Sequence, residues 1–195
     1  ELMTKSELAN DLGIELSAPP LLFTFHPETR NVENTSGHIS TILEALAMED
    51  GPMVLTYPNA DAYGSHIIEA INSFAKVKPD AYVVPHLGTR RYFSLMANAR
   101  VMVGNSSSGI IEAATFQLPV VNIGYRQHGR TRAKNVIDVE YSAKKISRAI
   151  DQASREDFRI GLRDLQNPYG DGRAAERICI RLESLFASET NRGAG

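Results

Sequence analysis

Short apolar runs and segments of helical spacing alternate along this chain of 195 residues. The apolar runs lack alternating polar residues, which is typical of strands buried on both faces of a parallel sheet. These runs are expected to form strands over 21–25, 52–57, 81–84, 101–103, 120–123 and 136–139. Apolar residues at helical spacing predict helices over 38–48, 66–75, 90–98, 107–116, 143–153 and 173–186. The order predicts an α/β fold: one Rossmann-like domain, a parallel sheet with helices on both faces.

The two ends of the chain are expected to lie outside this domain, which spans residues 19–187. Residues 1–18 form a predicted linker whose short helix is capped by Ser6 and stopped by Gly13. Residues 188–195 are expected to be a disordered tail. The first residue is a glutamate rather than an initiator methionine, and so the chain begins as a fragment cut from a longer protein would.

Composition and charge narrow the classes of partner. The net charge is −2, whereas proteins that bind nucleic-acid backbones usually carry a basic surplus. No apolar run approaches the roughly 20 residues that span a bilayer, and the polar start is unlike a signal peptide. The single cysteine, Cys179, excludes an internal disulfide and leaves no cysteine cluster for zinc. We therefore expect a cytoplasmic protein that binds neither nucleic acid nor membranes.

A turn rich in serine follows the predicted strand over 101–103. It reads Gly-Asn-Ser-Ser-Ser-Gly over residues 104–109 and enters the predicted helix over 107–116. Its spacing and its lack of a lysine distinguish it from a Walker loop. A serine at this place commonly only caps the helix, but three consecutive hydroxyl groups exceed what a cap needs. Ser106, Ser107 and neighbouring backbone N–H groups are therefore candidate phosphate ligands.

Two charged side chains are expected near this turn. Glu112, about one turn into the helix, either complements the helix dipole or accepts hydrogen bonds from the hydroxyl groups of a ribose. Arg126 follows the strand over 120–123 and stands near the start of a loop rich in cations, over 124–135. Because the carboxyl ends of parallel strands meet at one edge of the sheet, Arg126 is a candidate clamp for a diphosphate. The later cations of the loop fit a solvent-exposed role equally well.

Three further polar side chains follow other predicted strands. His26 ends the first strand, where it could protonate a departing phosphate oxygen, although a lone histidine after a strand is more often structural. Asn59 follows the second strand and is a candidate ligand contact, whereas for His86, after the third, the structural interpretation is favoured. The histidines and carboxylates do not cluster at metal-ligand spacing, and no nucleophile–histidine–acid set is evident. The site is predicted to bind a phosphorylated, nucleotide-bearing small molecule, with no metal.

Several motifs, in this order along the chain, resemble the hydrolysing UDP-N-acetylglucosamine 2-epimerases that serve sialic and related nonulosonic acid synthesis. The motifs are FHPET, TYPNADAYGS, VGNSSSGIIEAATFQLPVVNIGYRQHGR, AKNVIDV and YGDGRAAERI, which together cover about residues 20–185. The resemblance implies the C-terminal half of a GT-B fold, in which two Rossmann-like domains face each other across a cleft. It implies a catalytic role for His26 and no metal or redox cofactor. It also implies UDP contacts by His26, Asn59, Ser106, Ser107, Glu112 and Arg126.

The implied reaction expels UDP by elimination across C1–C2 of UDP-N-acetylglucosamine, and water then adds to the 2-acetamidoglucal to give free N-acetylmannosamine. In the family the N-terminal domain supplies the acidic residues that move the C2 proton, and this chain matches only the C-terminal domain. We therefore expect the chain alone to bind UDP weakly at best and not to turn over. Its implied partners are that N-terminal domain and, for the full-length protein, further copies in a homo-oligomer.

Two other functions stay open on the sequence. The same architecture occurs in one half of GT-B glycosyltransferases, and a nucleotide-binding module without catalysis would also keep it. The patterns His26-Pro27 and Arg126-Gln127-x-Gly129-Arg130 favour the epimerase. Within that family the NADAYGSH segment favours the hydrolysing sialic-acid type, and a 2,4-diacetamido sugar stays open as the substrate.

Overall fold

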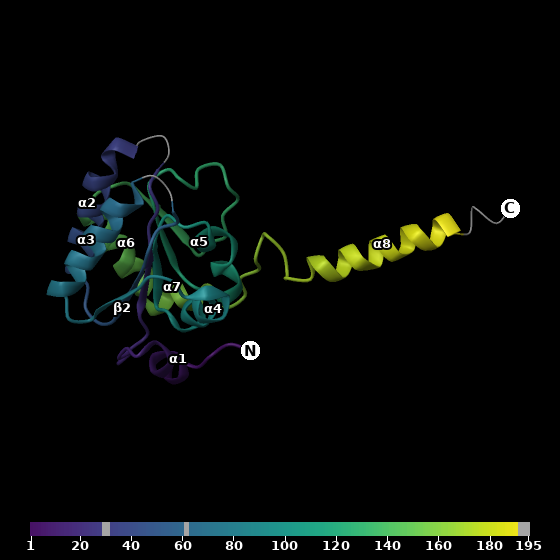
Figure 1. Cartoon of the computed structure of the whole chain (residues 1–195), viewed down its shortest axis with the longest axis horizontal. Coiled ribbons are helices and arrows are strands. Elements are labelled where there is room, and N and C mark those ends of the chain that lie inside the picture. Colours follow the sequence, from purple (N-terminus) through teal and green to yellow (C-terminus); the bar gives the residue numbers. More distant parts are fainter. Residues whose placement is uncertain (29–31, 61–62, 191–195) are drawn as a thin grey trace.

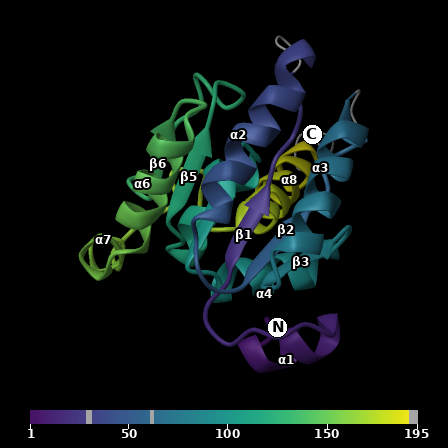
Figure 2. The ribbon, with the colours of Figure 1, turned by 90° about the vertical axis from the view of Figure 1, so that its left-hand side faces the viewer.

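The computed structural model describes residues 1–28, 32–60 and 63–190 and holds a six-stranded sheet (Figure 1). All strands pair in parallel, in the order β3-β2-β1-β4-β5-β6, and the labelled strands of Figure 2 follow this order. Their bounds are β1 Leu21–Thr24, β2 Met53–Thr56, β3 Ala81–Val84, β4 Val101–Gly104, β5 Val120–Ile123 and β6 Val136–Val139. The predicted strands and the parallel sheet are confirmed. This is the doubly wound order, in which the winding changes direction between β1 and β4.

Helices cover both faces of the sheet (Figure 1). One face carries α2 (Thr35–Ala47), α3 (Gly64–Val77) and α6 (Ala143–Ser154), and the other carries α1 (Lys5–Leu12) and α4 (Gly88–Asn98). Successive strand residues serve opposite faces: Leu21 and Phe23 of β1 belong to one core, and Leu22 belongs to the other. This double burial explains why the strands are apolar at consecutive positions.

The first helix starts earlier than predicted and is docked on the domain. Its cap is Thr4 rather than Ser6, because Thr4 Oγ1 accepts the Glu7 N–H at 3.3 Å while Glu7 Oε2 accepts the Thr4 N–H at 2.8 Å. This reciprocal capping box satisfies two N–H groups that helical hydrogen bonds leave unpaired. The helix ends at Gly13 as predicted, with φ 65°. Leu8 is fully buried in the core beside α4, which holds α1 against the sheet.

The helix predicted over 107–116 is wrong in its length. Only one turn is α-helical, α5 (Ser108–Ile111), and a 3₁₀ turn, η2 (Ala113–Phe116), follows it. A glycine followed by two β-branched isoleucines weakens the helix, and Gln117, at φ 52°, ends it. The pattern also missed two short elements, η1 (Val32–Asn34) and α7 (Glu156–Ile160).

The last helix, α8 (Ala174–Thr190), extends away from the rest of the domain (Figure 1). It runs past its predicted end at residue 186 into the segment expected to be a tail, of which residues 191–195 lie outside the described part. It exposes the large apolar side chains of Ile178, Ile180, Leu182, Leu185 and Phe186. Among the described residues, no helix combines the length and apolarity needed to cross a membrane. The domain limits at residues 19 and 187 stay predictions.

Candidate functional site

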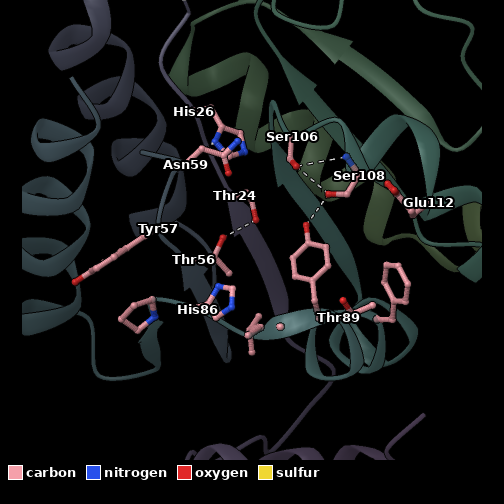
Figure 3. A pocket seen from close by; sticks show the side chains of 15 residues that line it. Thr24, His26, Thr56, Tyr57, Asn59, His86, Thr89, Ser106, Ser108 and Glu112 are labelled. Atoms are coloured by element: carbon pink, nitrogen blue, oxygen red, sulfur yellow. Dashed lines mark hydrogen bonds between the residues drawn. The ribbon is translucent and has the colours of Figure 1, made fainter. Parts of the chain in front are cut away.

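A cleft of about 380 Å³ opens beyond the carboxyl ends of β1 to β4 (Figure 3). It lies at the change in winding between β1 and β4, which is where doubly wound sheets bind their ligands. Its polar lining comprises Thr24, His26, Thr56, Tyr57, Asn59, His86, Thr89, Tyr92, Ser106, Ser108 and Glu112. Four of the six predicted contacts are thus brought together: His26, Asn59, Ser106 and Glu112. Ser107 and Arg126 do not line the cleft, whereas His86, interpreted from the sequence as structural, does.

His26 is buried, and two asparagines fix it at the edge of the cleft. Asn105 Oδ1 accepts the His26 backbone N–H at 2.7 Å, and Asn105 Nδ2 donates to the His26 carbonyl oxygen at 2.8 Å. The Asn59 backbone N–H donates to His26 Nδ1 at 3.1 Å. Because Nδ1 acts as an acceptor, the neutral imidazole carries its proton on Nε2. This geometry suits a proton donor held in one orientation.

The serine turn presents a chain of hydroxyl groups, and Ser106 Oγ also accepts the Ser108 backbone N–H at 3.4 Å. Ser108 Oγ lies 2.6 Å from the Tyr92 hydroxyl and 2.9 Å from Ser106 Oγ, as the dashed lines of Figure 3 show. Ser107 is the N-cap residue of α5, which begins at Ser108, but its side chain makes no capping hydrogen bond. The structure therefore favours Ser106 and Ser108 as cleft donors. Sequence reasoning missed Tyr92 and Ser108, since only the fold brings α4 beside the turn.

Glu112 lines the cleft and keeps one carboxylate oxygen buried without a partner among the described residues. It is the C-cap residue of α5 and makes no side-chain capping bond to η2, so the dipole interpretation is not supported. Its Oε2 is buried and has no hydrogen-bond partner among the described residues. Burial raises the pKa of the Glu112 carboxyl, and the charge of Arg130 opposes the rise. A carboxylate in the wall of a cleft can accept hydrogen bonds from hydroxyl groups.

The loop after β5 brings Arg126 to the outer side of the serine turn. Arg126 Nη1 donates to the Asn105 carbonyl oxygen at 3.3 Å, and Gln127 Nε2 donates to the same oxygen at 2.8 Å. Arg132 pairs with Asp138 at 2.7 Å. Arg126 is therefore held near the turn, at the rim rather than in the wall of the cleft.

Glu28, which sequence reasoning also missed, is buried beside this loop. Its Oε1 accepts the backbone N–H groups of Tyr125 at 2.9 Å and Arg126 at 3.2 Å, and the Tyr141 hydroxyl at 2.7 Å. Its place in the FHPET motif, two residues after His26, was the signal available in the sequence.

These groups together can hold an anionic ligand that also carries hydroxyl groups. Hydroxyl donors and a guanidinium lie near the serine turn, Glu112 adds a carboxylate to the wall, and the His26 imidazole lies where the loops after β1 and β2 meet. Within the described residues, no group of three His, Cys, Asp or Glu side chains is placed to hold a metal ion.

Comparison with known proteins agrees with this fold. The sequence profile of the UDP-N-acetylglucosamine 2-epimerase family matches residues 2–183. The chain is 36% identical over 159 residues to the GDP/UDP-N,N'-diacetylbacillosamine 2-epimerase (hydrolyzing) of Campylobacter jejuni, covering 80% of this chain and 41% of that protein. It is 36% identical over 164 residues to the UDP-N,N'-diacetylbacillosamine 2-epimerase (hydrolyzing) of Legionella pneumophila, covering 84% and 42%.

The chain thus spans about two-fifths of the length of these curated relatives. Its fold is similar to that of the Neisseria meningitidis UDP-GlcNAc 2-epimerase bound to UDP-GlcNAc, with a TM-score of 0.71 and 16% identity. The match covers 92% of this chain and 49% of that structure, in keeping with one half of a GT-B fold. The chain belongs to the UDP-N-acetylglucosamine 2-epimerase family.

Proposed function

We propose that this chain is the UDP-binding half of a hydrolysing UDP-sugar 2-epimerase. The observation that carries the proposal is the cleft at the β1–β4 junction, where His26, Ser106 and Glu112 meet. In this assignment the diphosphate lies against the serine turn near Arg126, and the ribose hydroxyl groups donate to Glu112. Because the chain spans about two-fifths of its relatives, turnover belongs to a longer protein that includes an N-terminal domain.

The proposed reaction breaks the bond between C1 of the sugar and the diphosphate oxygen. A base from the N-terminal domain removes the C2 proton, the electron pair forms the C1–C2 double bond, and UDP leaves. Water then adds across that double bond, with its oxygen at C1 and a proton at C2 on the opposite face. His26, with its proton on Nε2, donates to the departing diphosphate oxygen in the first step.

The substrate is proposed to be a UDP-linked 2-acetamido sugar. UDP-N-acetylglucosamine, which would give N-acetylmannosamine, is one candidate. The names of the Campylobacter and Legionella relatives support a 2,4-diacetamido sugar as the other. Incubating the longer protein with each UDP-sugar and measuring released free sugar separates them.

Binding is tested by calorimetry on the chain with UDP and ADP. We expect weak binding of UDP and weaker binding of ADP. No binding of UDP, or equal binding of both nucleotides, would contradict the uridine assignment.

Chemistry is tested with the longer protein in heavy water. An epimerase that removes the C2 proton will leave deuterium at C2 of the released sugar, whereas the isolated chain is expected to release none. If the sugar is transferred to an acceptor and no free sugar is released, the protein is a glycosyltransferase. UDP binding with neither reaction would identify a nucleotide-binding module.

A further inference from the structure

Glu28 joins two loops that the sheet holds apart. It follows β1, yet Oε1 accepts the backbone N–H groups of Tyr125 and Arg126, which follow β5. Strand β4 lies between β1 and β5 in the sheet. The carboxylate, which follows β1, therefore fixes the backbone of the loop after β5 across the intervening strand β4. A third donor, the Tyr141 hydroxyl, binds the same oxygen at 2.7 Å.

The surroundings leave Glu28 little freedom. The Tyr141 ring stacks on His38 with 3.6 Å between ring centroids and meets the Phe25 ring edge-on. Gly124 has φ 76°, and a Cβ there would overlap both the Tyr141 hydroxyl and Glu28 Oε1. A glycine is thus required for the carboxylate to approach the loop so closely.

We propose that Glu28 is a positioning residue that holds Arg126 toward the diphosphate. The inference rests on the proposed function. Glu28 does not line the cleft, its Oε1 is filled by three donors, and a carboxylate in contact with a phosphate would be repelled. Its effect on the ligand passes through Arg126, whose backbone N–H it binds and whose guanidinium reaches the Asn105 carbonyl oxygen.

The first measurement is hydrogen exchange of the Tyr125 and Arg126 amides in the ligand-free chain. Glu28→Gln replaces the carboxylate by a weaker acceptor, and Tyr141→Phe removes one donor without touching the loop backbone. We expect both variants to exchange these two amides faster than the wild-type chain. Tyr169→Phe is the matched control, because it removes an exposed phenol-to-carbonyl hydrogen bond to Thr131 in the same loop.

The second measurement is the affinity for UDP and for uridine by NMR titration. Because hydrogen bonds to a charged group are stronger than those to a neutral one, Glu28→Gln should lower the affinity for UDP by about tenfold. Tyr141→Phe should lower the affinity for UDP by a smaller factor, and Tyr169→Phe should leave it unchanged. Uridine has no phosphate for Arg126, so its affinity should stay the same in all three variants. A purely structural role for Glu28 would lower thermal stability but leave the ratio of the two affinities unchanged.

The outcomes separate this inference from the function on which it rests. If the wild-type chain binds UDP and both Glu28→Gln and Tyr141→Phe bind it equally well, the role of Glu28 is refuted and the proposed function stands. Unchanged amide exchange in both variants refutes it too. If the wild-type chain does not bind UDP, the proposed function fails, and this inference fails with it.

Discussion

Gly104 and Thr24 stand opposite each other at the ends of β4 and β1, and no side chain fits between them. Gly104 has φ 135°, and a Cβ on it would overlap the Thr24 carbonyl oxygen. The same oxygen accepts the Asn105 N–H at 3.2 Å. This close approach starts the serine turn at the point where Asn105 can reach His26, so the shape of the cleft depends on a glycine at this position.

Gly104→Ala should therefore destabilise the domain severely, by about 3 kcal/mol or more, because backbone atoms must move apart. Urea denaturation of the chain gives the free energy of unfolding. Gly13→Ala is the control: Gly13 also has a positive φ, 65°, but its Cβ would meet nothing within 4 Å. That variant measures the strain of a left-handed backbone without any contact, about 1 kcal/mol. Equal losses in the two variants would show that the contact with Thr24 is unimportant.

The Asn105 side chain supplies one donor and one acceptor to His26, and Asn105→Asp removes the donor. Asn105 is fully buried, so a carboxylate there would face the His26 carbonyl oxygen without solvent. We expect the free energy of unfolding to fall by about 3 kcal/mol at neutral pH. The deficit should shrink in acid, where a protonated Asp can again donate. The exposed Asn10→Asp should change stability by less than about 0.5 kcal/mol, and a similar loss there would count against the explanation.

The strands and most helices could be predicted because each depends on local periodicity. Both faces of β1 are buried, and this makes residues 21–23 a continuous apolar run. The length of α5 could not be predicted in this way. The apolar spacing indicates a helix that continues past residue 111, whereas Gly109 and the two isoleucines weaken that helix. The structure resolves that conflict in favour of a single turn followed by η2.

The site could be predicted where a residue directly follows a strand or, like Glu112, stands at the end of the short helix that begins in the serine turn. His26 and Ser106 stand at strand ends, and their positions at the sheet edge follow from the parallel order. Glu28 contacts Tyr141, 113 residues later in the sequence, and no local pattern announces such a partner. The hydrogen bond between the Tyr92 and Ser108 hydroxyl groups could not be predicted either, because it depends on how α4 packs beside the serine turn.

Glu112 should make the ligand-free chain less stable as pH rises. Its carboxyl pKa is raised above the ordinary value of 4.5, chiefly by burial. A raised pKa contributes stability that is present below the ordinary value and is lost as pH rises through the folded value. Glu112→Gln should therefore gain stability relative to wild type as pH rises above about 4.5. Denaturation over a pH series measures the difference in free energy of unfolding between the variant and the wild-type chain. Burial also raises the pKa of Glu49, but both proteins contain Glu49, so its contribution cancels in the difference.

Glu140→Gln is the control of opposite sign. Lys145 holds the pKa of the exposed Glu140 carboxyl below its ordinary value, so its contribution is present above that value and is lost as pH falls. A Glu112 difference that follows the same direction as that of Glu140 would contradict the buried-carboxylate explanation.

Arg126→Ala should lower the affinity for UDP by about tenfold to a hundredfold, because a guanidinium can bind two phosphate oxygens through parallel hydrogen bonds. Arg126→Lys keeps the positive charge but loses the planar guanidinium, so its affinity for UDP should lie between that of the wild-type chain and that of Arg126→Ala. Lys134→Ala removes the same charge from an exposed position of the same loop and should change UDP affinity by about twofold or less. Calorimetry with UDP and with uridine measures all three. If Lys134→Ala weakens UDP as much as Arg126→Ala does, the loop attracts the ligand through its net charge and Arg126 has no positioned contact with the diphosphate.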